Sequence, residues 1–378
     1  MAKKIVLCFD GTWNDPGANT NVIKMYKSIL GEDKSPGRVG VPVPTPNENT
    51  IKWYDKGVGT ARVNKIRGGL TGRGLSRNIL EGYKFLVDNY EDDDRIYLFG
   101  FSRGAYTARS LAGLIRNIGI LHKVSAPEAK IEDNPVLMNG FWIYQRRDAY
   151  ADTEEAIYFR QKYSIDNAEI HFLGIWDTVG AMGIPSNDLD KVDRRYEFHD
   201  TELSRRVKNA YHALSIDETR PEFVPTLWTS KPKEGQRVEQ VWFAGVHSEI
   251  GDGKRPSLTD IPLRWMQEKA IENHLELDPD QIVCIRIEHY IRAQVTNHFA
   301  PPWQNAGWNP LGWNHYSLAA RVRRSRPHRR PIGGTPVECV HDLVRQKIDA
   351  PNSSYKPTNH GLESADTCPG VGDEWECV

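Results

Sequence analysis

The stretch Arg95–Leu111, RIYLFGFSRGAYTARSL, decides the fold, because an apolar strand leads directly into a glycine-flanked serine and an amphipathic helix leaves it. Its centre, residues 100–104, fits the G-x-S-x-G pattern of a nucleophile elbow around Ser102. Such a turn holds the serine oxygen above a sheet, and it needs small flanking residues where strand and helix crowd together. The alternative is that Ser102 only N-caps the following helix.

The sequence around this stretch predicts an α/β fold, an α/β-hydrolase-like and mostly parallel sheet flanked by helices, because short apolar runs alternate with amphipathic segments. Expected strands are Ile5–Phe9, Glu169–Trp176 and Val238–Val246, with an extended segment at 51–54. Helices are expected at 21–30, 72–90 and 257–274. We expect one domain, 1–378, with a helical insertion or lid at 121–165 and a Trp/Arg-rich cap at 294–331.

Composition indicates a globular protein and argues against a nucleic-acid-binding or membrane-spanning one. The 378 residues are 39% hydrophobic and 26% charged, and a net charge of -1 favours neither nucleic acid nor an acidic membrane. The apolar run near the N-terminus breaks at Asp10, and no run approaches a membrane span. A cytoplasmic location is therefore expected by default, with non-classical export left open.

The five cysteines are scattered and lack zinc-site spacing, so no metal is expected. Cys8 lies in an apolar run and is interpreted as a small buried hydrophobe. Reduced thiols are the expectation for the set. A Cys368–Cys377 disulfide is the alternative.

A serine nucleophile needs a base and an orienting acid, which in this fold follow in the order acid, then histidine, each just past a strand. Asp177 directly follows the strand that ends at Trp176, and His247 follows the strand expected to end at Val246. Chain order and strand-end placement predict a Ser102–His247–Asp177 triad. Alternatively, Asp177 caps a turn and His247 is a structural loop histidine.

Other carboxylates and histidines are rivals for these two roles. The rival acids are Asp217 and Glu249, but Glu249 is too near His247 in sequence to orient its far ring nitrogen. The rival histidines are His212, His298 and His341, none of which directly follows so clear an apolar strand.

The segment Ile5–Asp15, IVLCFDGTWND, resembles the first motif of an aspartate-nucleophile phosphatase, but Cys8 occupies the position of the attacking carboxylate. In a hydrolase this strand precedes a loop that supplies one oxyanion amide, and the residue after the nucleophile supplies the other. The predicted donors are the backbone N–H groups of Gly11 or Thr12 and of Arg103.

With these motifs the chain resembles the type VI secretion phospholipase effector-like catalytic domain family, an uncharacterised α/β-hydrolase family. The matching stretches are CFDGTWN, GFSRGAYTAR, IWDTVGAMG, HALSIDETRPEFVPTLW, WFAGVHSEIGDG and LTDIPLRWM, with a weaker match, VHDLVRQKI…YKPTN, near the C-terminus. The resemblance implies a serine esterase or lipase, some relatives cleaving phospholipids, with Ser102, Asp177 and His247 at the family's catalytic motifs. Asp252 replaces a glycine of the family's loop after the histidine, so substrate preference does not transfer directly.

The segment 301–330 has the most unusual composition in the chain. Tryptophans recur at fivefold spacing and six arginines follow: Trp303, Trp308 and Trp313, then Arg321, Arg323, Arg324, Arg326, Arg329 and Arg330. Tryptophan favours the water–lipid boundary and arginine attracts anionic head groups, so peripheral membrane contact is one interpretation. Packing onto the core and a solvated, ion-paired face are the alternatives, and nucleic acid is not expected.

These observations predict a cofactor-independent serine hydrolase acting on carboxylic esters, with phospholipids and other acyl lipids as candidate substrates. Acyl transfer to another acceptor uses the same residues and is a second hypothesis. A non-catalytic binding module on a hydrolase scaffold is a third. The sequence identifies no partner protein.

Overall fold

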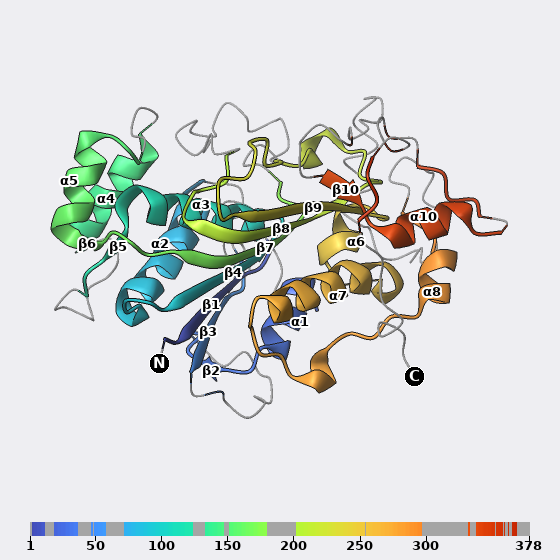
Figure 1. Ribbon diagram of the computed structural model, residues 1–378, viewed down its shortest axis with the longest axis horizontal. Helices are drawn as coiled ribbons and strands as arrows, with labels where there is room; N and C mark the ends of the chain where they lie inside the picture. Colours follow the sequence, from blue (N-terminus) through green and yellow to red (C-terminus); the bar gives the residue numbers. More distant parts are fainter. Residues whose placement is uncertain are drawn as a thin grey trace, which may run out of the picture.

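A single parallel sheet forms the centre of the molecule (Figure 1). The computed structural model describes residues 2–11, 19–36, 47, 49–57, 72–123, 133–146, 151–179, 202–253, 255–296, 332, 338–351, 353–357, 359, 362 and 365–368. Its eight strands run in the order β10-β9-β8-β7-β4-β1-β3-β2, and every pairing is parallel. They are β1 Lys4–Phe9, β2 Glu32–Asp33, β3 Thr50–Asp55, β4 Arg95–Phe101, β7 Ile170–Trp176, β8 Val207–Ser215, β9 Arg237–Phe243 and β10 Glu338–Val340. The predicted α/β fold is confirmed.

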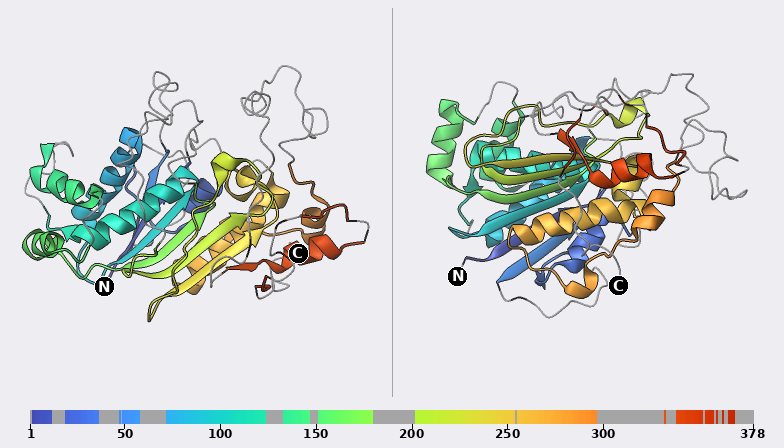
Figure 2. Two further views of the ribbon diagram at one scale, coloured as in Figure 1. Left: turned by 90° about the horizontal axis from the view of Figure 1, so that it is seen from above. Right: turned by 45° about the vertical axis from the view of Figure 1, so that its right-hand side comes forward.

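Helices cover both faces of this sheet, as the two views of Figure 2 show. The α-helices are α1 Asn21–Ser28, α2 Gly72–Asn89, α3 Arg103–Ile118, α4 Pro135–Gln145, α5 Glu154–Tyr163, α6 His247–Gly251, α7 Pro256–Glu272, α8 Ile287–Arg292 and α10 Asp342–Asp349. Among the described residues, the 3-10 helices are η5 Pro221–Phe223 and η6 Pro279–Gln281. Within the described part of the chain, no helix combines the length and apolar character that crossing a bilayer requires.

The alternation of side chains along β1 explains the two layers. Ile5, Leu7 and Phe9 pack in the core cluster of α2 and α3, whereas Val6 and Cys8 face the cluster of α1 and α7. Successive strand residues point to opposite faces, so a strand buried on both sides is apolar throughout. Cys8 is fully buried with a free thiol, as expected.

The strand before the serine turn lies beside β1 and β7. The pairing of Phe9 with Gly100 in β1 and β4 puts the ends of both strands, and the loops that follow, at the same edge of the sheet. Trp176 of β7 pairs with Phe101 on the other side. The loops after β1, β4 and β7 therefore meet at one edge, where the ends of parallel strands form sites.

The strand β8 was not among the expected strands, and β9 ends at Phe243, three residues before the predicted end at Val246. Gly245 has φ 128°, a conformation that favours glycine and breaks the strand before His247. The last strand, β10, comes from nearly a hundred residues later in the chain.

The described part of the 121–165 insertion packs on α3. Its helices α4 and α5 lie in the chain between the two strands of a short antiparallel pair, β5 Ile120–Leu121 and β6 Ser164–Ile165. Contacts join the insertion to the second half of α3: Gly140 approaches Ile118, and Arg160 donates to the carbonyl of Asn117 at 2.9 Å. At 1.5 Å per residue these sites lie about 20 Å along the helix from Ser102. The role of 121–165 as a lid stays a prediction.

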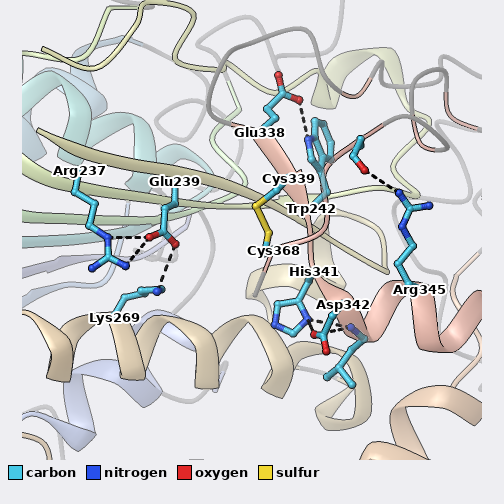
Figure 3. The surroundings of a disulfide bond; sticks show 12 residues. Arg237, Glu239, Trp242, Lys269, Glu338, Cys339, His341, Asp342, Arg345 and Cys368 are labelled. Carbon is cyan, nitrogen blue, oxygen red and sulfur yellow. Dashed lines mark hydrogen bonds and ion pairs between the residues drawn. A yellow bond between two sulfur atoms is a disulfide. The ribbon is translucent and has the colours of Figure 1, made fainter. Parts of the chain in front are cut away.

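The C-terminal segments join the same core as the sheet. Val340 of β10 and Leu343 of α10 belong to the cluster that contains β9. A disulfide links Cys339 to Cys368 (Figure 3). Cys284 is also disulfide-bonded. The expectation of reduced thiols was therefore wrong, and so was the Cys368–Cys377 alternative, because β10 brings Cys339 beside Cys368. Of the Trp/Arg-rich cap, 297–331 lies outside the described residues.

Candidate active site

Ser102 sits at the sharp turn between β4 and α3. Its backbone has φ 56° and ψ -120°, and its side chain does not cap the helix. The capping alternative is therefore excluded. A non-glycine residue with positive φ costs on the order of 1–3 kcal/mol and is characteristic of functional turns. The predicted elbow is present.

Two glycines permit this turn. A Cβ on Gly100 would collide with the carbonyl oxygen of Gly104, and a Cβ on Gly104 would collide with the carbonyl oxygen of Phe9. Backbone atoms cannot move aside as a flexible side chain can. The spacing of the motif therefore reflects the close approach of β4, α3 and β1.

The three predicted catalytic side chains form one hydrogen-bonded chain. Ser102 Oγ lies 2.9 Å from His247 Nε2, and His247 Nδ1 lies 2.6 Å from Asp177 Oδ2. Asp177 and His247 are buried, whereas Ser102 is partly exposed. Asp177 is acceptor-only when ionised, so Nδ1 carries the proton and Nε2 accepts from Ser102. The order serine, histidine, aspartate is the one found in the catalytic triads of serine hydrolases.

Asp177 is held from the end of β8. Its carboxylate accepts from the backbone N–H of Ser215 at 3.1 Å and from the Ser215 hydroxyl at 3.2 Å. Its own φ is 37°, a second strained position in the site. The neighbouring Thr178 N–H donates to Nε2 of His212 at 3.1 Å. His212, a rival for the base, therefore supports the loop of the acid.

The rival acids bind the backbone around His247 instead of its ring. Three successive amides each donate to a carboxylate: Gly245 to Asp217 at 2.7 Å, Val246 to Glu249 at 3.0 Å and His247 to Glu218 at 3.2 Å. The rival His341 N-caps α10, and His298 lies outside the described residues. Glu218 and Ser215 were missed as site residues, although both belong to the quoted stretch HALSIDETRPEFVPTLW.

The predicted oxyanion donors are only partly described. Arg103 begins α3, where the first backbone N–H groups have no acceptor within the helix and the dipole favours negative charge. Gly11 N–H donates at 2.7 Å to Oδ1 of Asp10, whose Oδ2 accepts from Tyr54 and Thr20. Thr12 lies outside the described residues. In this structure the Gly11 amide is thus bound to Asp10.

Metal ligation has no candidate among the residues that the structure describes: no three His, Cys, Asp or Glu side chains are grouped to hold an ion. The carboxylates around His247 accept backbone or hydroxyl hydrogens, as given above.

The parallel sheet and its serine elbow define a protein of the α/β-hydrolase class. The family described as "T6SS, Phospholipase effector Tle1-like, catalytic domain" matches residues 3–269. The chain belongs to this family, as the motifs predicted.

Individual relatives match over part of their length. The uncharacterized protein YEL023C of Saccharomyces cerevisiae is 31% identical over 255 residues, which cover 61% of this chain and 33% of the yeast protein. The chain thus spans about a third of that relative.

Three solved structures resemble the chain at low identity. An uncharacterized protein from Pseudomonas aeruginosa has 18% identity and a TM-score of 0.44, covering 86% of this chain and 51% of that one. The Tle1 effector bound to the VgrG spike has 21% identity and a TM-score of 0.37, covering 68% and 52%. A thermophilic esterase from Thermogutta terrifontis, Est2, has 13% identity and a TM-score of 0.34, covering 74% and 84%.

Proposed function

We propose that this protein is a serine hydrolase that cleaves carboxylic esters of acyl lipids, phospholipids included, through an acyl-enzyme on Ser102. The observation that carries the proposal is the continuous hydrogen-bonded chain from Ser102 through His247 to Asp177. Membership of a family described as phospholipase effectors supports the lipid substrate.

In the proposed reaction, Ser102 Oγ attacks the ester carbonyl carbon while His247 Nε2 takes the hydroxyl proton. Asp177 keeps the imidazole oriented and stabilises its charged form. The tetrahedral intermediate collapses when His247 returns the proton to the leaving alkoxide. Water then attacks the acyl-enzyme by the same route and releases the fatty acid.

We propose the Arg103 amide as one oxyanion donor, because it opens α3 directly after the nucleophile. The second donor is proposed to be the amide of Gly11 or Thr12. Since Gly11 N–H is bound to Asp10, its use requires that the oxyanion replace this carboxylate. One such donor is worth about 3 kcal/mol of the barrier.

The setting of the reaction is a further part of the proposal. Peripheral contact with a lipid surface through 294–331 and a cytoplasmic location stay predictions. The neighbouring Tle1 structure is bound to a VgrG spike, and a protein partner of this chain is proposed only by analogy with it.

The test compares the wild type with Ser102→Ala on nitrophenyl esters of increasing chain length and on phospholipid vesicles. The proposal predicts hydrolysis by the wild type that rises with acyl length and is abolished in the variant. Equal hydrolysis by both proteins would overturn the assignment of Ser102, and a preference for acetyl esters with intact vesicles would overturn the lipid substrate.

A further inference from the structure

Glu218 is a buried carboxylate that touches the histidine of the site through its backbone. Its side chain is 0% exposed, and Oε2 accepts from the His247 N–H at 3.2 Å. A buried charge requires a close partner. Arg220 provides it, with Nε at 2.8 Å from Oε1 and Nη2 at 2.6 Å from Oε2, and its backbone N–H donates to Oε1 at 2.9 Å. The carboxylate is therefore fixed in position and in charge.

Arg220 also contacts the imidazole ring of His247 indirectly, through Phe223. The Arg220 guanidinium lies 3.8 Å from the centroid of the Phe223 ring, a cation–π distance. The Phe223 ring is 4.8 Å from the imidazole of His247, and Phe101 lies at the same distance from it. The contacts form a closed circuit from the His247 amide through Glu218, Arg220 and Phe223 to the His247 ring.

We propose that Glu218 is a positioning residue of the reaction, which sets the orientation of His247 through this circuit. The inference rests on the proposed function. The bond to Asp177 fixes the tautomer and one edge of the imidazole, but not the starting point of the side chain or the plane of the ring. Glu218 fixes the starting point, and Phe223, held by Arg220, packs against the ring.

This circuit directs Nε2 at Ser102. A displacement of about 1 Å in an aligned catalytic group can cost on the order of 100-fold in rate. Removing Glu218 should therefore slow the chemical step and leave ester binding nearly unchanged.

The experiment measures kcat and KM for a nitrophenyl ester, and the thermal midpoint, in Glu218→Ala, Glu218→Gln and a control. The control is Glu338→Ala in β10, because Glu338 is also a buried carboxylate and accepts from Trp242 Nε1 at 2.8 Å. Both alanine variants should lower the midpoint. Should Glu218→Ala fail to fold, Glu218→Asp replaces it, because this variant keeps the charge and withdraws the oxygen by one methylene.

The proposal predicts that Glu218→Ala lowers kcat by about 10- to 100-fold with KM within about twofold. Glu218→Gln should restore only part of kcat, because its amide oxygen can still accept from the His247 N–H, whereas its NH2 group cannot accept from Arg220 as the second carboxylate oxygen does. Glu338→Ala should keep the wild-type kcat. Two outcomes would overturn the proposal: a kcat in Glu218→Ala no lower than in the control, or a loss confined to KM.

A second readout separates this proposal from the proposed function. The proton between His247 Nδ1 and Asp177 should give a downfield NMR signal, assigned by its loss in His247→Asn. It should broaden or vanish in Glu218→Ala and persist in Glu338→Ala. If the wild type hydrolyses no ester, the proposed function fails, and this signal alone decides the role of Glu218: an unchanged signal in Glu218→Ala rejects it.

Discussion

Ser102 and His247 are 145 residues apart in sequence, yet Oγ of the serine and Nε2 of the histidine are 2.9 Å apart. The parallel sheet creates this relationship. Ser102 follows β4 and His247 follows β9 after a three-residue break, so both leave the same edge of the sheet, with β7 and β8 between them. Asp177, directly after β7, hydrogen-bonds the other ring nitrogen of the histidine, Nδ1.

Replacing Asp177 with asparagine should lower kcat without unfolding the protein. The amide cannot hold the Nδ1 proton as a carboxylate does, so the imidazole loses its productive tautomer and the stabilisation of its charged form. By comparison with other serine triads the loss should be about 10³- to 10⁴-fold. Ester hydrolysis and thermal denaturation measure the two quantities. An activity within tenfold of the wild type would show that another group orients His247.

Gly104→Ala should be severely destabilising. Its methyl group would collide with the carbonyl oxygen of Phe9, so β1 or α3 must shift, and we expect a loss of several kcal/mol in the free energy of unfolding. Gly113→Ala is the matched control on the same helix, because the atoms nearest its methyl group belong to the Tyr144 side chain, at 3.1 Å and beyond, and not to the backbone. Urea denaturation compares them. Equal stability of the two variants would contradict the close packing at the elbow.

Asp217 should make stability depend on pH. Burial raises its pKa to about 7, and hydrogen bonds from the Gly245 amide and the Tyr355 hydroxyl offset this only in part. Because the folded pKa is above the unfolded value, its contribution is complete below about pH 4 and is lost as pH rises through about 7.

The variant Asp217→Asn should flatten the decline in the free energy of unfolding between about pH 4 and 7. Denaturation across this range, with the exposed Asp280→Asn as control, measures the difference. A decline as steep in Asp217→Asn as in the wild type would refute the raised pKa.

The Cys339–Cys368 disulfide should stabilise the C-terminal segments. It closes a loop with a sequence separation of 29, for which the expected gain is about 3.6 kcal/mol. Replacing both cysteines with alanine should speed hydrogen exchange in β10 and α10 and leave β1 and β4 unchanged. Unaltered hydrogen exchange in α10 would contradict this prediction and show that the core contacts of α10 stabilise it without the disulfide.

The turn at Ser102 and the placement of Asp177 and His247 just past strand ends were predictable because each depends on local sequence. An apolar strand, two glycines at fixed spacing and polar residues just past strand ends are visible without coordinates, as at Ser102, Asp177 and His247. The strand β8 was missed because Lys208, Asn209 and His212 interrupt its apolar run. The Asn209 side-chain amide donates to the backbone carbonyl of His171 in the neighbouring strand β7, and this contact exists only once the sheet has formed.

The residues that hold the site from neighbouring strands could not be predicted, because their contacts depend on how the strands pair in the sheet. Glu218 meets the His247 amide only because β8 and β9 are neighbours, and nothing in its spacing marks it as buried. Cys339 meets Cys368 only because β10 adds to the edge of β9. Both contacts therefore depend on which strands are neighbours in the sheet.

The most direct test of the central claim is labelling with an alkyl fluorophosphonate, mapped by tandem mass spectrometry. The account predicts one adduct, on Ser102, that is absent in Ser102→Ala and forms far more slowly in His247→Ala. An adduct on another residue, or none in folded wild-type protein, would contradict the claim that His247 activates Ser102.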